Sequence, residues 1–261
     1  MTMSRFGIVR GVVSGLIAAS ALAAGGRAEA AEIRVLSAGA VRAIITELAE
    51  AFTRETGHTV AFQFGTAGVT RGKLEAGEPA DVVILTDVAI DQMAGQGLVT
   101  RGTRTDIGRT AIGVGVRDGA AKPDIATPEA FKQAVLAAKS ITYVDPAQGA
   151  TSGIHLAGVL QRLGIADAVK GKTTLVPGGY PAELVAKGEI EMVVHQISEI
   201  LPVKGVALVG PLPRDLQKFT VYSAGMAAKS AQPELARAFM EFVTRPAAKA
   251  RLAQAGLDYR E

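Results

Sequence analysis

Two short turns of small residues are the segments of this sequence best suited to do chemistry. They read Ser37-Ala38-Gly39-Ala40 and Gly65-Thr66-Ala67-Gly68, and each lies between an apolar strand-like run and a helix-like run. Such a turn points unpaired backbone N–H groups and the positive end of a helix dipole at one spot. The residues expected to contribute to a site for a small anion are therefore Ser37, Gly39, Ala40, Thr66, Ala67 and Gly68.

Basic side chains follow both turns. Arg71 lies in the first turns of a helix that begins near Gly68, and we expect it to bind a carboxylate, because guanidinium groups hold carboxylates in a two-pronged manner. The alternative is a surface pair with Glu75. Arg42, just after the first turn, is open to the same two interpretations.

A third candidate segment is Thr151-Ser152-Gly153-Ile154-His155, which is predicted to open a helix. One interpretation makes Thr151 or Ser152 the hydroxyl cap of that helix. The other lets the first-turn N–H groups bind the anion, with His155 one turn further on reaching the same pocket. Both interpretations can hold together, so Thr151 and Ser152 are expected ligand contacts.

His195 ends the apolar run IEMVVHQ and is expected to face the ligand cleft, because open α/β sheets bind ligands at the carboxyl ends of their strands. A purely structural histidine is the alternative. If the protein is an enzyme, His195 or His155 is the expected general base. With three histidines, no cysteine and no H-x-x-x-H spacing, no metal site is predicted.

These residues must be positioned by an α/β fold, since short β-rich runs alternate with amphipathic runs of helix length. The expected strands are Ile33–Leu36, Thr59–Phe64, Asp81–Leu85, Ile141–Val144, Thr173–Val176 and Ile190–His195. The expected helices are Val41–Thr56, Gly68–Ala76, Val88–Ala94, Pro128–Lys139, Ser152–Leu163, Pro181–Lys187, Pro233–Val243 and Ala247–Ala255. The sheets are expected to be mainly parallel.

Two alternating runs, Thr110–Arg117 and Thr220–Ala228, interrupt this rhythm and resemble crossovers between two lobes. We therefore expect a discontinuous lobe one over residues 31–115 and 223–261 and a lobe two over residues 116–222. A cleft between two such lobes can close around a ligand as a hinge.

Residues 1–30 are expected to be a secretory signal peptide. Arg5 and Arg10 come first, an apolar core runs from Gly11 to Ala24, and Ala28-Glu29-Ala30 forms an A-x-A cleavage signal. The apolar run falls short of the roughly 20 residues that span a bilayer. The expected location is the periplasm, with no membrane span in the mature chain.

The composition argues against nucleic-acid binding. Removing residues 1–30 takes away three of the 28 basic and one of the 25 acidic residues, which leaves a net charge of about +1. Basic residues are scattered among acidic ones, and tryptophan is absent. No G-x-S-x-G, Walker or dinucleotide glycine motif is present, so serine hydrolase, nucleotide and hydride chemistry are disfavoured.

The order of these features resembles that of the molybdate-binding proteins of ABC transporters, within the type II periplasmic solute-binding fold. The resemblance covers essentially the whole mature chain: VLSAGAV, FGTAGVTRGKLEAGEPADVVILTD, YVDPAQGATSGIH, KGEIEMVVHQ and the helix pair QPELARAFMEFVTRPAAKARLAQAGL. It implies a two-lobe α/β protein that binds a small anion and delivers it to the membrane subunits of an ABC importer.

The resemblance also implies which ligand groups are missing. Molybdate binders hold their oxyanion with serine hydroxyls in the first two turns and a late tyrosine, and the matching positions here are Ala40, Ala67 and His195. An organic carboxylate or polycarboxylate therefore suits this sequence better than molybdate. The alternative is an enzyme like aconitate isomerase, which resembles this family and would interconvert trans- and cis-aconitate by an allylic proton shift that needs no cofactor.

Overall fold

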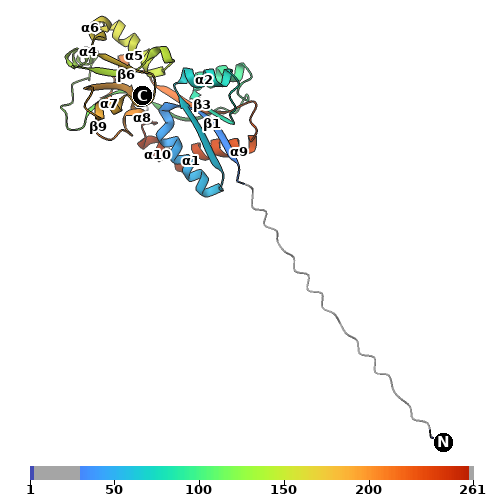
Figure 1. Cartoon of the computed structure of the whole chain (residues 1–261). Helices are drawn as coiled ribbons and strands as arrows, with labels where there is room; N and C mark the ends of the chain where they lie inside the picture. Colours follow the sequence, from blue (N-terminus) through green and yellow to red (C-terminus); the bar gives the residue numbers. More distant parts are fainter. Residues whose placement is uncertain (3–29, 259–261) are drawn as a thin grey trace.

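A computed structural model describes residues 1–2 and 30–258. Nearly all of the expected signal peptide therefore lies outside the described residues. Two lobes, each built on its own five-stranded sheet, lie side by side (Figure 1). None of the helices in these ranges is long and apolar enough to cross a membrane.

Lobe one contains the first sheet, in which one strand runs against the other four. Its strands are, in spatial order, β2 (Thr59–Gly65), β1 (Glu32–Ala38), β3 (Val82–Thr86), β10 (Thr220–Met226) and β4 (Thr105–Thr110). β1 is parallel to β2 and β3, and β10 is antiparallel to both β3 and β4. The return strand β10 thus completes a sheet that the N-terminal part of the chain begins.

The second sheet has the same mixed character and forms lobe two. Its strands are, in spatial order, β7 (Thr173–Val176), β6 (Ile141–Val144), β8 (Met192–Gln196), β5 (Ile112–Arg117) and β9 (Val206–Pro211). β6 is parallel to β7 and β8, whereas β5 is antiparallel to β8 and β9. The sheets expected to be mainly parallel are therefore mixed, with one antiparallel strand each.

Helices follow most strands in both lobes. In lobe one they are η1 (Gly39–Val41), α1 (Arg42–Thr56), α2 (Ala67–Glu75), α3 (Asp87–Gly95), α9 (Pro233–Thr244) and α10 (Pro246–Gln254). In lobe two they are α4 (Pro128–Ala137), η2 (Pro146–Gln148), α5 (Thr151–Arg162), α6 (Ala166–Lys170), α7 (Ala182–Ala186) and α8 (Ile197–Ile200). The one-turn helix η3 (Arg214–Leu216) lies in the returning connection.

The passage between the lobes corrects the expected boundaries. The alternating run Thr110–Arg117 is two strands of different sheets, because β4 ends at Thr110 and β5 begins at Ile112. The chain changes sheet at the fully buried Ala111, not near residue 116. It returns between β9 and β10, so Thr220–Tyr222 lies in the first sheet and not in lobe two.

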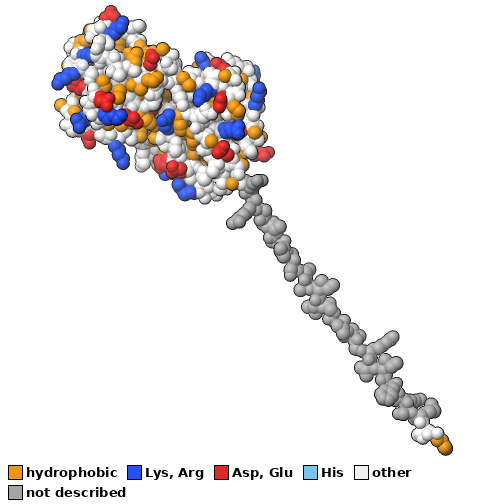
Figure 2. Space-filling view, viewed as in Figure 1, with side chains coloured by type: hydrophobic (Ala, Val, Ile, Leu, Met, Phe, Trp, Pro, Cys, Tyr) orange, Lys and Arg blue, Asp and Glu red, His pale blue; other side chains and the backbone are white. Residues whose placement is uncertain are grey.

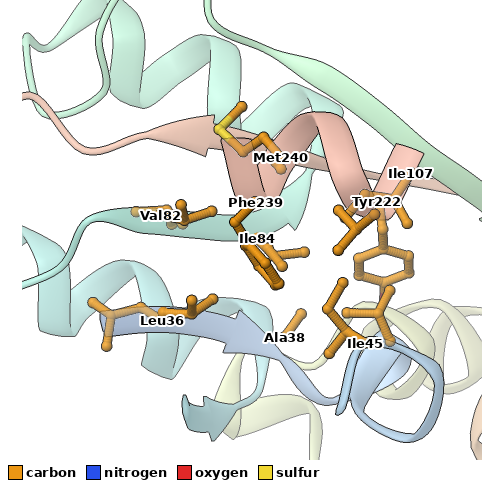
Figure 3. Close-up of a cluster of buried hydrophobic side chains, with 14 of the residues drawn as sticks. Leu36, Ala38, Ile45, Val82, Ile84, Ile107, Tyr222, Phe239 and Met240 are labelled. Carbon is orange, nitrogen blue, oxygen red and sulfur yellow. The ribbon is translucent and has the colours of Figure 1, made fainter. Parts of the chain in front are cut away.

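The core of lobe one holds the sheet against α1 and α9. Phe52 meets the rings of Phe239 and Phe242 edge-on, with centroids 5.4 and 5.3 Å apart. Such edge-to-face pairs contribute about 0.5–1.5 kcal/mol beyond the burial of their area. In Figure 3, Phe239 lies beside Ile84 and Tyr222 lies in the same cluster of buried side chains. Lobe one therefore has its own core, and lobe two has another around Phe131.

Charges of both signs are mixed on one face of the molecule. Figure 2 shows Lys and Arg side chains interspersed with Asp and Glu side chains over the face in view.

Candidate ligand cleft

A cavity of about 350 Å³ lies between the two lobes and takes side chains from both. The residues that line it are Ala38, Gly39, Ala40, Arg42, Phe64, Gly65, Thr66, Ala67, Val69, Val144, Ala150, Thr151, Ser152, Pro177, Gly178, Gly179, His195, Gln196, Glu199 and Tyr222. Most of them follow the ends of strands β1, β2, β6 and β8, which is where open α/β sheets bind ligands. The volume lies near the lower end of the range of about 300–1,000 Å³ found for small-molecule sites.

Helix beginnings supply backbone donors on two sides of the cavity. η1, which leads into α1, begins at Gly39, and α5 begins at Thr151, in both cases without a hydrogen bond from a capping side chain. The hydroxyl cap expected from Thr151 or Ser152 is thus not formed, and Ala150 occupies the cap position. Uncapped first-turn N–H groups are available to an anion.

The second expected turn is organised differently. The hydroxyl of Thr66 accepts a hydrogen bond from Val69 N and so caps α2. The same hydroxyl donates to the carbonyl oxygen of Gln148 in lobe two. Thr66 is therefore engaged in capping and in holding the lobes together, although its residue borders the cavity.

Lobes one and two touch directly beside this turn. Gly68 N donates to the carbonyl oxygen of Gly149 over 3.2 Å. A Cβ atom on Gly68 would lie 2.9 Å from the Cα of Gly149, which is closer than real Cβ contacts come. We call this contact, formed by Thr66, Gly68, Gln148 and Gly149, the glycine latch. It joins the two lobes at the edge of the cavity, which Thr66 lines.

The end of β8, the start of α8 and the first turn of α5 bring three polar side chains together in lobe two. Ser152 Oγ lies 2.9 Å from His195 Nδ1, and His195 Nε2 lies 3.2 Å from Glu199 Oε2. Their side chains are nearly inaccessible, at 3% exposed for His195 and 9% for Glu199. The four-residue spacing across the strand-to-helix turn explains why the imidazole and the carboxylate meet.

Arg42 supplies the guanidinium of the cleft. Its Cζ lies 4.7 Å from the centroid of the Phe64 ring and 5.6 Å from that of Tyr180, one ring from each lobe. Its Nε is buried and has no hydrogen-bond partner among the described residues. A carboxylate can therefore pair with this guanidinium while the two rings hold it in place.

Two tyrosines remain protonated donors in and beside the cleft. Burial, followed by the negative charge of Glu199, raises the pKa of Tyr180 to about 12, although Arg42 opposes the shift. The same two causes raise the pKa of Tyr222, whose hydroxyl oxygen accepts a hydrogen bond from Gln196 Nε2 at 3.3 Å. Both phenols therefore stay neutral at physiological pH.

Seven of the residues expected from the sequence line the cavity. They are Gly39, Ala40, Thr66, Ala67, Thr151, Ser152 and His195. Gly68 lies in the glycine latch, and Ser37 is fully buried one residue before the lining, where its hydroxyl donates to Ala38 O. The two turns therefore border the cavity mainly with backbone and methyl groups.

Two other expected residues lie elsewhere. Arg71 is half-exposed outside the lining and pairs with Glu75, its Nε 3.5 Å from Oε1 of that residue. His155 also lies outside the lining, because one turn along α5 its Nε2 is 2.7 Å from the carbonyl oxygen of Leu216. Burial is the main cause that lowers the pKa of His155.

Sequence reasoning did not single out Glu199 or Tyr222. Glu199 lies in the run ISEI, whose neighbours are apolar and buried, so nothing in its immediate surroundings marks it as functional. The available signal was its spacing of four from His195.

Among the residues that the structure describes, no cluster of three or more His, Cys, Asp or Glu could hold a metal ion.

Comparison with known proteins places this geometry in a wider group. The family model described as bacterial extracellular solute-binding protein matches residues 33–258. Aconitate isomerase from a Pseudomonas species is 36% identical over 225 residues, which are 84% of each chain. The molybdate-binding protein of Escherichia coli (strain K12) is 26% identical over 214 residues, which are 77% of this chain and 79% of that protein.

Solved structures with low sequence identity share the fold. The periplasmic molybdate-binding protein of Azotobacter vinelandii superposes with a TM-score of 0.72 at 20% identity, covering 88% of this chain and all of that one. The sulfate-binding protein SubI of Mycobacterium tuberculosis H37Rv gives a TM-score of 0.69 at 19% identity, covering 87% and 86% of the two chains. The fold is thus that of type II periplasmic binding proteins.

Proposed function

This chain belongs to the bacterial extracellular solute-binding proteins, and we propose that its cleft is the active site of an isomerase acting on a small unsaturated polycarboxylate, with aconitate as the compound to test first. The observation that carries the proposal is the buried pair of His195 and Glu199 in the lining of a cleft whose other groups favour anions.

A carboxylate in such a place is costly for a protein that only binds. Glu199 repels the negative charge that Arg42 and the starts of η1 and α5 attract, and it lies where little water screens it. A proton-transfer reaction, in contrast, needs an acid–base group within reach of the substrate. The 36% identity to aconitate isomerase supports this choice over simple capture.

The methyl groups of Ala40 and Ala67 support an organic substrate. They border the cavity where hydroxyls would be needed to bind a bare oxyanion through neutral donors. One guanidinium, two uncapped helix starts and neutral phenols suit a ligand with separate carboxylates and a carbon skeleton. No metal or organic cofactor is needed for the proposed proton shift.

The experiment is incubation of the purified protein with trans-aconitate, followed by proton NMR. We expect cis-aconitate to appear, and we expect His195→Ala to lower turnover, because it removes one member of the buried pair. His58→Gln is the control, because His58 lies outside the cleft lining and its Nδ1 accepts a hydrogen bond from Ala31 N. Absence of turnover by the wild-type protein would refute the proposal.

A second candidate is a carrier that captures a carboxylate in the periplasm and delivers it to an ABC importer. Family membership and the solved neighbours favour it. A thermal-shift panel of organic carboxylates, sulfate and molybdate tests this role. Tight binding of one compound without chemical change would support the carrier, and a response to molybdate alone would argue against a carboxylate ligand.

Export to the periplasm is part of both candidates. It is supported by the leader-like residues 1–30 and by the family. Fractionation of the cells that make the protein, with N-terminal sequencing of the mature form, tests whether the chain is cleaved after Ala30.

A further inference from the structure

Glu199 is the acidic side chain of the cleft lining within the described residues, and it crosses from one lobe toward the other. It belongs to α8 of lobe two, yet a Cβ atom built on Gly39 of lobe one would lie 3.0 Å from its Oε1. Gly39 is the residue at which η1 begins, so Oε1 reaches the turn where backbone donors meet an anion. This carboxylate oxygen therefore lies where a bound substrate must come close.

His195 is placed differently. Its Nδ1 faces Ser152 Oγ at 2.9 Å, and its Nε2 faces Glu199 Oε2 at 3.2 Å. Its side chain is 3% exposed, against 9% for Glu199. Nδ1 is hydrogen-bonded to Ser152, whereas Nε2 is buried and makes no hydrogen bond among the described residues, so a substrate reaches Glu199 more readily than the imidazole.

The two oxygens of Glu199 are thereby distinguished. Oε2 lies 3.2 Å from the imidazole Nε2, whereas Oε1 points to Gly39 in the other lobe and accepts no hydrogen bond from any residue in the described part of the chain. An oxygen without a partner at the edge of a cavity is free to accept a proton from a ligand. The imidazole lies against the carboxylate on the side away from Gly39, and the hydrogen bond with Ser152 orients the imidazole.

We propose that Glu199, through Oε1, is the catalytic residue that carries the proton in the isomerisation, and that His195 and Ser152 are positioning residues that hold its carboxylate. This assignment rests on the proposed function. It replaces His195 and His155 as the acid–base group and names a residue that sequence patterns had not indicated.

The step balances without any co-reactant. The carboxylate of Glu199 takes a proton from the methylene carbon of aconitate, and the electron pair of that C–H bond forms a new double bond to the central carbon. The electrons of the old double bond move onto the far carbon and its carboxylate, where Arg42 can stabilise the charge. The far carbon then takes the proton back from Glu199, so substrate and product differ only in the positions of one proton and one double bond.

Glu199→Gln separates proton transfer from binding, because glutamine keeps the shape of the side chain and removes its charge. We expect turnover of trans-aconitate, measured by proton NMR, to fall at least about 100-fold. Exchange of the methylene hydrogens for deuterium in heavy water is expected to fall in parallel. Binding of propane-1,2,3-tricarboxylate, the saturated analogue that cannot react, is expected to stay equal or become tighter, because a like charge has been removed.

Glu183→Gln is the matched control. Glu183 lies in α7 near Tyr180, but it is exposed and outside the cleft lining. We expect it to change neither turnover nor analogue binding by more than about twofold, as for surface substitutions within about 0.5 kcal/mol. In Glu199→Ala, added formate is expected to restore part of the turnover, which a folding defect would not allow.

His195→Gln tests the positioning role. We expect a fall in kcat with little change in KM, because the carboxylate loses its neighbouring imidazole. A merely structural histidine would lower the amount of folded protein and leave the kcat of the folded fraction unchanged.

The outcomes distinguish the two levels of the proposal. Wild-type protein that neither isomerises aconitate nor exchanges its hydrogens overturns the proposed function together with this assignment. Wild-type protein that is active, with Glu199→Gln within tenfold of it, overturns the assignment alone. Loss of analogue binding in parallel with turnover in Glu199→Gln also overturns it, since Glu199 would then act in binding.

Discussion

Arg42 illustrates how a single side chain can be prepared for a ligand by its neighbours. Its guanidinium lies between Phe64 and Tyr180, and no ion pair holds it among the described residues. We expect Arg42→Gln to weaken binding of propane-1,2,3-tricarboxylate by roughly 10- to 100-fold, because hydrogen bonds to charged groups contribute about 1.5–3 kcal/mol. Isothermal titration calorimetry measures the change.

The comparison variant is Arg71→Gln, which removes an arginine whose partner is Glu75 on the surface. We expect its effect on binding to stay below about twofold. A larger loss for Arg71→Gln than for Arg42→Gln would contradict the placement of the ligand-binding guanidinium.

His155 is expected to make the stability of the folded protein depend on pH. Burial is the main cause that lowers its pKa below the ordinary 6.5, against the opposing effect of the Leu216 carbonyl. The unfolded chain therefore binds the proton more readily, so stability is fully present above about pH 6.5 and declines as the pH falls through and below that value. His155→Gln should flatten the dependence of Tm on pH between about 7 and 5, as followed by calorimetry. An unchanged slope would show that other groups dominate.

At the scale of residues, the backbone N–H donors of the cleft were easier to predict from the sequence than its acid–base side chain. Small residues before helices mark exposed N–H groups, and such turns are recognisable from residue type alone. Glu199 was not recognisable, because its role depends on a long-range approach to Gly39 in the other lobe. Arg42 and Arg71 each follow one of the two turns, so the sequence alone does not show which one binds the ligand. In the structure, Arg42 packs against two aromatic rings of the cleft, whereas Arg71 pairs with Glu75 on the surface.

The first turn of α5 shows how closely an element must pack to place the site. Gly153, between Ser152 and Ile154, lies so near the end of β6 that a Cβ atom would collide with the backbone oxygen of Val144. Gly153→Ala should therefore lower the free energy of unfolding by about 1–3 kcal/mol, the usual cost of overpacking. It should also shift Ser152 and impair turnover.

The same helix offers the control for this prediction. Gly158 lies in the interior of α5, and a Cβ atom added to it would meet no other atom within 4 Å. Gly158→Ala should raise stability by about 0.5–1 kcal/mol, because alanine favours helix more than glycine does. Urea unfolding measures the free energy of unfolding of both variants. Equal changes in Gly153→Ala and Gly158→Ala would contradict the prediction.

Element ends were predicted where glycine marks them. Gly57 ends α1 in the left-handed conformation, at the position expected from the sequence. Short elements such as α6 and α8 escaped prediction, because five or four residues carry no clear periodicity. The strand β9 was missed for a similar reason, since its half-buried run of six residues shows no alternation.

At the scale of the whole molecule, the glycine latch joins the two lobes, so we expect it to affect how the cleft closes. Gly68→Ala would push a methyl group against Gly149 and disturb the hydrogen bond from Gly68 N. We expect a larger radius of gyration in solution scattering and weaker binding of the tricarboxylate analogue. Gly72→Ala, four residues along the same helix with open space around it, should change neither.

An equal radius of gyration and equal affinity in Gly68→Ala and Gly72→Ala would show that the latch does not contribute to closure. Ligand should in turn favour the closed form, and a ligand at 100 times its Kd stabilises the protein by about 2.7 kcal/mol.

The two-lobe plan was predictable, but its boundaries were not. Two alternating runs suggested two crossings, and the structure has two. The exact crossing at Ala111 is hidden, because β4 and β5 follow each other with one buried residue between them and no turn residue. The alternation of apolar and polar residues predicts a strand, but it does not indicate which sheet that strand joins.

The double crossing also sets an order of events during synthesis. The second sheet is made from one continuous stretch, β5 to β9, and can assemble as soon as residue 211 has emerged. The first sheet must wait for β10, which lies between β3 and β4 in space although it is made more than a hundred residues after them. The nascent chain therefore cannot complete the first sheet until β10 has been made, near the end of synthesis.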